Sequence, residues 1–161
     1  MLEQVTVEKA EYSDLEEILT LQKLTFESEA KLFNDYLITP LTQSFESIQE
    51  DFKNNVYLKV IYNHRIIGSV RANMKDNICN IGRLIVHPEY QDNGIGKLLM
   101  FDIENRFKNC EKYSLFTAKR IEKNLKFYET LGYEAVKEEK VKENLIFVYY
   151  IKKNYKKNKS Y

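Results

Sequence analysis

One segment restricts the fold of this chain more than any other: an apolar strand that leads through a glycine-containing loop directly into a helix. Residues 84–97 read Leu-Ile-Val-His-Pro-Glu-Tyr-Gln-Asp-Asn-Gly-Ile-Gly-Lys, and Gly94 and Gly96 stand where the helix is expected to begin. Glycine lets the backbone approach a ligand closely and adopt a positive φ. The first N–H groups of a helix have no internal partner and lie at the positive end of its dipole. The segment therefore predicts an anion site, and phosphate is the anion that suits it best.

Two common phosphate-binding motifs do not fit this segment. A P-loop has Ser or Thr after its lysine, whereas Leu98 follows Lys97. A dinucleotide fingerprint has a third glycine, and counting from Gly94 that position is Leu99. A glycine pair before a helix is also typical of an ordinary strand-to-helix turn. The residues around the pair must therefore show whether the segment is a phosphate site or only a turn.

The wider pattern resembles the acetyl-CoA signature of the GNAT acetyltransferase superfamily. It consists of L-x-V-x-P over residues 84–88, Q-x-x-G-x-G over residues 91–96, and two leucines on the following helix. Residues 124–133 read Asn-Leu-Lys-Phe-Tyr-Glu-Thr-Leu-Gly-Tyr, which is similar to the second signature of the family, in which an asparagine stands a few residues before F-Y-E-x-x-G-[FY]. Individual residues match the family motifs from about 84 to 133. The order of helices and strands extends the resemblance over essentially the whole chain.

The predicted elements agree with this family. Hydrophobic periodicity predicts strands at 4–10, 56–62, 65–74, 78–86, 113–118 and 145–151, with one more strand before the last. It predicts helices over Leu15–Phe26, Phe45–Phe52, Ile95–Phe107 and Glu122–Leu131. We expect Ser13 to be the N-cap of the first helix, with Glu16 completing a capping box. The expected fold class is α/β (α+β), a GNAT fold whose mixed, mostly antiparallel sheet of about seven strands splays between strands 4 and 5 and is flanked by about four helices.

The resemblance implies a set of residues that bind acetyl-CoA. The backbone of the strand end would pair with the pantetheine amides, one N–H there would polarise the thioester carbonyl, and the loop N–H groups would hold the pyrophosphate. These cofactor-binding residues are Leu84, Ile85, Val86, Gln91, Asp92, Asn93, Gly94, Ile95, Gly96, Lys97, Asn124, Phe127 and Tyr128. Lys119, Arg120, Lys123 and Lys126 are candidates for the 3′-phosphate.

Tyr128 is the catalytic residue that the resemblance implies, because it matches the tyrosine beside the cofactor sulfur. Proton transfer from a tyrosine of pKa near 10 to a thiolate near 8.5 is uphill by roughly 2 kcal/mol. We therefore expect Tyr128 to act mainly by hydrogen bonding to the sulfur as charge builds on it.

The proton acceptor for the amine stays open at this point. Some family members supply a glutamate in the fourth strand, but Asn80 stands there in this chain and cannot act as a base. A water relay or a carboxylate from the first helix and its loop is the alternative, with Glu27, Glu29 and Asp35 as candidates. We interpret His87 and His64 as structural residues, at a strand end and in a hairpin turn.

Length, composition and charge limit the number of domains and the kinds of partner that we expect for this chain. The 161 residues fit one domain, and 25 basic residues nearly balance 24 acidic ones, which favours neither a nucleic-acid partner nor a membrane. Cys79 and Cys110 do not have the spacing of metal ligands, so we expect free thiols and no metal. The sequence shows no secretory segment and no apolar run of transmembrane length, so we expect a cytoplasmic protein. We expect an acetyltransferase domain over 1–154 and a basic C-terminal tail over 155–161.

The function predicted is transfer of acetyl from acetyl-CoA to the primary amine of a small molecule, by direct attack in a ternary complex. The alternatives are acetylation of a protein lysine or N-terminus, and a non-catalytic acyl-CoA-binding module. The acceptor is expected to be set by a loop at 30–41 and by the closing hairpin around 138–144. Acceptance of longer acyl groups stays open, as does oligomeric state, for which a homodimer is a tendency of the family.

Overall fold

The computed structural model describes residues 2–155, so the predicted basic tail lies outside the described residues except for Tyr155. Seven strands form one mixed sheet in the order β1-β2-β3-β4-β5-β7-β6, in which β4 and β5 are parallel. The strands are β1 (Thr6–Lys9), β2 (Val56–Tyr62), β3 (Arg65–Lys75), β4 (Ile78–Val86), β5 (Lys112–Ala118), β6 (Glu134–Lys142) and β7 (Leu145–Lys153). The α-helices are α1 (Leu15–Phe33), α2 (Thr39–Thr42), α3 (Phe45–Asn54), α4 (Ile95–Arg106) and α5 (Glu122–Thr130). The expected fold class is confirmed.

The contacts within the chain divide it into two compact units. Among the described residues, the first comprises 2–73 and Arg83–Asn105, and the second comprises Met74–Gly82 and 106–155. The boundary passes through β4, so the first residues of that strand belong to the second unit and its last residues to the first.

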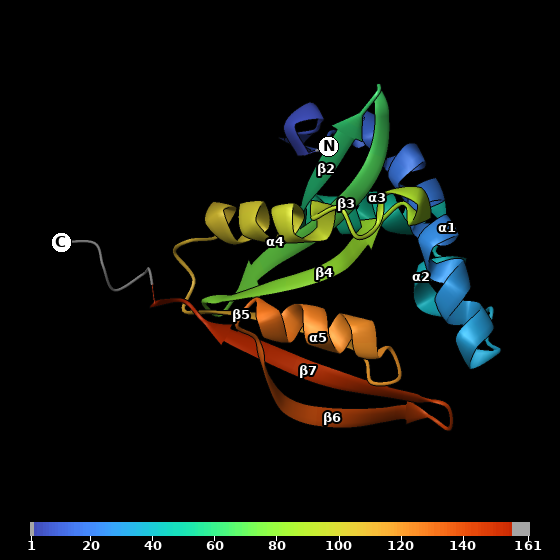
Figure 1. Ribbon diagram of the computed structural model, residues 1–161, viewed down its shortest axis with the longest axis vertical. Coiled ribbons are helices and arrows are strands. Elements are labelled where there is room, and N and C mark those ends of the chain that lie inside the picture. Colours follow the sequence, from blue (N-terminus) through green and yellow to red (C-terminus); the bar gives the residue numbers. More distant parts are fainter. Residues whose placement is uncertain (1, 156–161) are drawn as a thin grey trace. The chain divides into compact units, whose positions relative to one another are not determined.

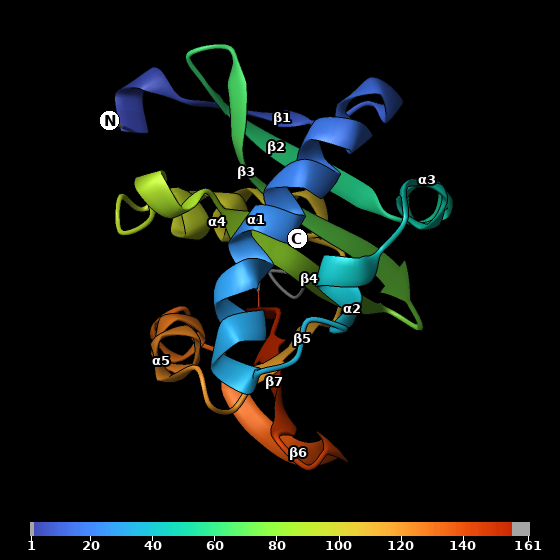
Figure 2. The same ribbon diagram turned by 90° about the vertical axis from the view of Figure 1, so that its right-hand side faces the viewer.

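In the first unit, α1 and α3 cover one face of the antiparallel strands (Figure 2). The hydrophobic core on this face joins Leu15 and Ile18 of α1, Ile48 of α3, Tyr57 of β2 and Ile85 of β4, all almost fully buried. Apolar residues at helical spacing on α1 meet apolar residues at alternate positions of the strands, as their periodicity predicts.

Helix α4 packs at Gly68 of β3. A β-carbon there would lie 3.2 Å from the carbonyl oxygen of Ile85, from Cγ2 of Ile95 and from Cδ1 of Leu99. Glycine is therefore needed at this position for the close approach of helix and strand.

The beginning of α1 differs from the prediction. A 3₁₀ turn over Tyr12–Asp14 precedes the helix, and the Glu11 N–H donates to Asp14 Oδ2 at 2.7 Å. The predicted N-cap at Ser13 is therefore wrong: Asp14 is the N-cap of α1, and its carboxylate forms a capping box with Glu11 around the 3₁₀ turn instead of capping α1. The same carboxylate pairs with Lys59 of β2 at 2.7 Å, a contact that local sequence could not reveal.

The end of α1 also differs from the prediction. The helix continues through Phe33 to a left-handed C-cap at Asn34, so the first residues of the expected acceptor loop at 30–41 are helical. Ala30 and Phe33 are buried, which explains the extension: the segment continues the inward face of α1. The short helix α2 was not predicted; it begins beside Pro40, at a position that proline tolerates.

The second unit is built around β5, β7 and β6 (Figure 1). β5 and β7 are antiparallel over Lys112–Ala118, and β6 pairs with β7 to form the edge. The parallel pairing of β4 with β5 joins Ile78 with Lys112, Cys79 with Tyr113 and Asn80 with Ser114. The hairpin turn between β6 and β7 is formed by residues 143–144, so most of the predicted 138–144 turn region is strand.

Several local predictions are confirmed. Asn63 and His64 have φ of 48° and 62°, and Asp76 and Asn77 have φ of 51° and 63°, as two-residue hairpin turns require. Cys79 and Cys110 are buried thiols and do not form a disulfide. No helix within residues 2–155 has both the length and the apolar character needed to cross a membrane.

Candidate active site

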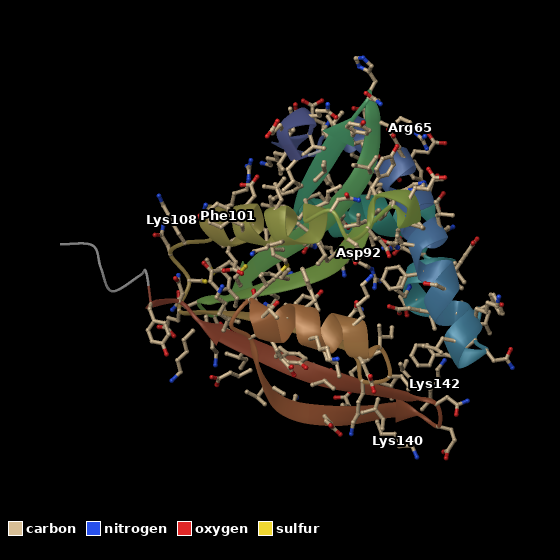
Figure 3. The ribbon with its side chains drawn as sticks, viewed as in Figure 1. Arg65, Asp92, Phe101, Lys108, Lys140 and Lys142 are labelled. Carbon is tan, nitrogen blue, oxygen red and sulfur yellow. The ribbon has the colours of Figure 1, made fainter. Side chains whose placement is uncertain are left out.

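The loop before α4 has the backbone geometry of an anion site. Asp92 and Gly94 have φ of 62° and 80°, and Leu98 N–H donates to the Gly94 carbonyl at 3.0 Å, which makes Gly94 the N-cap of α4. The N–H groups of residues 95–97 therefore precede the first helical hydrogen bond and lie at the positive end of the helix dipole. Gln91, Asp92, Asn93 and Gly94 are exposed, and the position of Asp92 can be followed in Figure 3. A ligand with phosphate oxygens can reach this backbone.

Side chains of the same loop hold its shape. Gln91 Nε2 donates to the Val86 carbonyl at 3.1 Å, and Asn93 Nδ2 donates to the carbonyls of Tyr90 and Gln91 at 3.2 and 3.0 Å. His87 Nδ1 accepts from the Glu89 N–H at 3.1 Å, and its ring lies 5.5 Å from that of Tyr90. These contacts agree with the structural role predicted for His87, and they leave the backbone N–H groups as the loop's means of binding an anion.

Tyr128 lies in an aromatic cluster of the second unit. Its ring centroid is 5.1 Å from Phe127, 6.0 Å from Tyr133 and 6.3 Å from Tyr150. Tyr133 and Tyr150 are almost completely buried, whereas Tyr128 is half-buried. The cluster fixes the ring of Tyr128, which is the first requirement for a residue that acts through its hydroxyl.

Asn124 stands one turn before Tyr128 on α5. Its Nδ2 donates to Thr117 Oγ1 of β5 at 3.4 Å, and its N–H donates to the Ile121 carbonyl at 3.0 Å. Asn124, Phe127 and Tyr128 thus share one helix of the second unit, while Leu84–Lys97 belong to the first unit. Each of the two predicted sets is brought together within its own unit.

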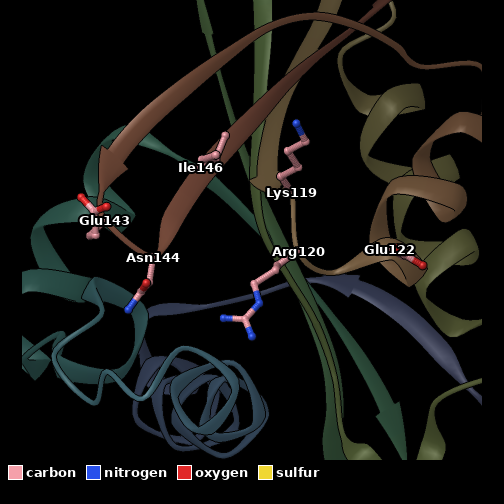
Figure 4. A pocket seen from close by; sticks show the side chains of 6 residues that line it. All are labelled: Lys119, Arg120, Glu122, Glu143, Asn144 and Ile146. Carbon is pink, nitrogen blue, oxygen red and sulfur yellow. The ribbon is translucent and has the colours of Figure 1, made fainter.

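A pocket of about 520 Å³ opens in the second unit beside the start of α5 (Figure 4). It is lined by the β5–α5 connection and by the turn between β6 and β7, with the residues Lys119, Arg120, Glu122, Glu143, Asn144 and Ile146. Lys119 is paired with Glu138 at 2.9 Å, and both side chains are about half exposed. Two residues predicted to bind phosphate, Lys119 and Arg120, therefore share a pocket with the hairpin predicted to contact the acceptor.

The three carboxylates considered as proton acceptors have different environments. Glu27 is exposed, and Asp35 Oδ1 accepts the Leu37 N–H at 2.9 Å in the turn after α1. Glu29 is half-buried on α1, and burial raises the pKa of its carboxyl to about 7, although the positive charge of Arg83 acts in the opposite direction. An altered proton affinity such as that of Glu29 is typical of acid–base residues.

A polar network lies on the face of the first unit that α1 and α3 cover. Asp51 Oδ2 of α3 accepts hydrogen bonds from the Tyr57 hydroxyl of β2 and from Arg71 Nη1 of β3. Asn55 Nδ2 donates to the Asp51 carbonyl at 2.8 Å, and Asn73 Nδ2 donates to Asn55 Oδ1 at 3.0 Å. Burial and the bond to Asp51 raise the pKa of the Tyr57 hydroxyl to about 12, so Tyr57 is a neutral donor.

Arg83 of β4 is part of the same electrostatic environment. Its φ of 50° lies in the left-handed region that arginine rarely adopts. Burial and the like charge of Arg71 lower the pKa of its guanidinium to about 10, while Tyr57, Asp51 and Glu29 act in the opposite direction. Its Nε is buried and has no hydrogen-bond partner among residues 2–155.

Sequence reasoning missed this network of Arg83, Arg71, Asp51 and Tyr57. One signal was available: Arg83 is the only charged residue of β4 and stands directly before Leu84–Val86. The other members are ordinary residues of a helix and two strands in the sequence, and only the pairing of the strands and the packing of α3 bring them together. Among residues 2–155, no group of three His, Cys, Asp or Glu side chains is arranged to hold a metal ion.

This chain resembles a known protein family and a set of solved structures. A model of the acetyltransferase (GNAT) domain matches residues 22–154. A search of curated protein sequences found no significant match.

Solved structures of the same fold include acetyltransferases of different kinds. The Escherichia coli ribosomal-protein-S18-alanine N-acetyltransferase matches with a TM-score of 0.77 at 12% identity, over 93% of this chain and 94% of that one. A spermidine N-acetyltransferase chimera from Vibrio cholerae and hSSAT matches with a TM-score of 0.77 at 18% identity, over 98% and 99% of the two chains. The PaiA N-acetyltransferase from Thermoplasma acidophilum, in complex with coenzyme A, matches with a TM-score of 0.75 at 16% identity, over 92% and 98%.

Proposed function

Because the chain belongs to the GNAT acetyltransferase family and is thus an acyltransferase, we propose that it transfers the acetyl group of acetyl-CoA to the primary amine of a small molecule. The observation that carries this proposal is the loop before α4, where exposed residues at positive φ lead into the N–H groups that precede the first helical hydrogen bond of α4. Such a loop suits the pyrophosphate of coenzyme A.

The binding of acetyl-CoA follows from the backbone. Residues 95–97 would donate their N–H groups to the pyrophosphate, and Leu84–Val86 would offer main-chain groups to the pantetheine arm. Acetyl-CoA supplies an activated thioester, and an N–H of this strand end would stabilise the negative charge that develops on its carbonyl oxygen. Asn124 and Phe127 would contact the cofactor from α5.

Tyr128 would hydrogen-bond to the sulfur as the thiolate departs. The aromatic rings of Phe127, Tyr133 and Tyr150 hold its ring in place, so that little freedom is lost when the bond forms. Direct attack by the amine requires only that the acceptor and acetyl-CoA be bound together, since no residue has to carry the acetyl group.

The class of acceptor is tested by following where the acetyl group of acetyl-CoA is transferred. The purified protein is incubated with isotopically labelled acetyl-CoA and a filtered cell extract, and label is followed in small-molecule and protein fractions. Label in a discrete metabolite is the expected result. Label confined to polypeptides would instead indicate a protein acetyltransferase, and intact acetyl-CoA in both fractions would indicate a binding module.

The role of Tyr128 is tested by Tyr128→Phe. We expect thiol release to slow by about 100-fold or more, because removing one preorganised hydrogen-bond donor to a developing negative charge costs about this much, while acetyl-CoA affinity stays nearly unchanged. Tyr150→Phe is the matched control, since it removes the hydroxyl that contacts Glu129 at 3.2 Å in the same cluster. Equal rates for Tyr128→Phe and wild type would refute the assigned role.

A further inference from the structure

We propose that β6 (Glu134–Lys142) pairs with β6 of a second copy of this chain, antiparallel and centred on Glu138, so that the protein is a symmetric dimer. The inference goes beyond the proposed function and does not depend on it. Its basis is the free edge of the sheet in the second unit, the exposure of β6 and the order of the charges along it.

β6 is an edge strand whose outer side is open to another strand. It stands last in the order β5-β7-β6, and β7 is its strand partner within residues 2–155 (Figure 1). All nine of its residues are exposed, including the apolar Val136 at 55% and Val141 at 47%. The outer edge presents a row of N–H and C=O groups with which a further strand can pair. Pairing there would also cover part of these two valines.

The charges of β6 decide which strand can pair with it. Charged side chains on an edge ordinarily keep other strands away. In an antiparallel pair centred on Glu138, however, Glu134 faces Lys142 and Lys137 faces Glu139, and the symmetry repeats both contacts. Opposite charges directly across an antiparallel pair stabilise it. The edge is thus complementary to itself, which is what a twofold interface requires.

The four charges of these pairs lie on one face of the sheet. Glu134, Lys137, Glu139 and Lys142 stand opposite alternate residues of β7, and alternate residues of a strand share a face. Their partners in β7, taken in order, are Ile151, Tyr149, Phe147 and Leu145. Since residues opposite each other in an antiparallel pair point to the same side, the charged side chains of two copies can meet on this face.

The irregularities of β6 fit the same register. The strand shifts against β7 twice, once between Glu134 and Lys137 and once between Glu139 and Lys142. Each of these intervals contains two residues. In the antiparallel pair the first interval of one copy lies opposite the second interval of the other, so that bulge faces bulge and the strands remain equally long. Both kinds of charge pair are therefore compatible with one register.

Glu138, at the centre of the interface, is balanced within its own chain. It stands opposite Val148 of β7, between the outward positions, and so lies on the other face of the sheet from the four paired charges. Its carboxylate pairs with Lys119 at 2.9 Å. This ion pair reduces the repulsion between the two glutamates that would meet at the twofold axis.

The order of the charges also selects this register over its neighbour. A shift by one residue towards the turn would set Glu138 against Glu139 and Lys137 against Lys140, so that like charges would meet. The centred pairing would in addition hold the turn at 143–144, which directly follows β6 and lines the pocket of the second unit.

The test measures the association of the full chain by sedimentation velocity at low salt, from about 1 to 100 μM, because dimerisation depends on protomer concentration. The proteins compared are wild type, Glu134→Lys, Lys142→Glu and the variant that combines both changes. Glu111→Lys is the matched control, since it makes the same charge change at an exposed residue outside β6. Thermal unfolding of each variant shows whether it is folded.

We expect wild type and Glu111→Lys to sediment as dimers. Glu134→Lys and Lys142→Glu each bring like charges together at both ends of the interface and should raise the dimer dissociation constant by about tenfold or more. The combined variant exchanges the charges and should restore the dimer. An equimolar mixture of the two single variants should form heterodimers, because the lysines of one then face the glutamates of the other.

Three results would overturn the inference. A wild type that is monomeric over the whole concentration range does not pair through β6. A dimer that Glu134→Lys and Lys142→Glu leave unchanged uses another surface. Weaker association that neither the combined variant nor the mixture restores does not come from these charge pairs. None of these outcomes involves acetyl transfer, so the proposed function stands or falls separately.

Discussion

The environment of Glu29 makes a prediction about stability that does not depend on catalysis: Glu29→Gln should stabilise the protein above pH 7 and leave its stability unchanged below pH 4.5. Burial raises the pKa of the carboxyl from its ordinary 4.5 to about 7 in the folded state. Between these values the unfolded chain ionises Glu29 while the folded protein keeps it protonated, so ionisation favours unfolding increasingly as pH rises. Above about pH 7 the folded state ionises too, and the destabilisation reaches a constant value.

The size of the effect follows from the shift. A change from 4.5 to about 7 corresponds to about 3 kcal/mol, since one pKa unit corresponds to about 1.4 kcal/mol. The carboxyl is only half-buried and keeps some contact with solvent, which lowers the expected gain for Glu29→Gln to about 1–2 kcal/mol at pH 8. Glutamine has nearly the same volume and stays neutral, so that the substitution leaves the packing of α1 largely intact.

The assay is urea denaturation followed by far-UV circular dichroism at pH 5 and pH 8. The free energy of unfolding of Glu29→Gln, wild type and Glu27→Gln is obtained at both values. Glu27→Gln is the matched control, because Glu27 lies on the same helix and is exposed. A difference between Glu29→Gln and wild type that is the same at both pH values, or that the Glu27 variant also shows, would refute the reasoning.

Two further predictions concern Gly68 and Gly94, at which a side chain would be strained. Gly68→Ala should lower the free energy of unfolding by about 1–3 kcal/mol with an unchanged denaturant m-value, because its β-carbon would meet three atoms at 3.2 Å, one of them a backbone oxygen; urea denaturation measures this. Gly94→Ala should lower the free energy of unfolding by about 1–2 kcal/mol, because Gly94 has a φ of +80°. It should also weaken acetyl-CoA binding, because it strains the start of α4. Calorimetric titration with acetyl-CoA checks this second effect, and an unchanged affinity would count against the assigned pyrophosphate loop.

The sequence alone determined the strands, most of the helices and the family. β2 and β4 begin and end at the predicted residues, and the turns at 63–64 and 76–77 form as predicted. These features depend on periodicity and on the conformations that asparagine, aspartate and glycine tolerate, which act over a few residues. The loop proposed to bind the cofactor belongs to the same class, because its glycines and the helix that follows are contiguous.

Only the tertiary structure decided the start and end of α1 and the environment of Glu29. Asp14 replaces Ser13 as the capping residue and also pairs with Lys59, which lies 45 residues further along the chain. Glu29 and Glu27 are equivalent by residue type and local sequence, and they differ because packing buries one and exposes the other. The pKa of Glu29 is set by that burial and by Arg83 on a distant strand. Local sequence specifies which elements form, whereas desolvation and charge proximity exist only once those elements have packed.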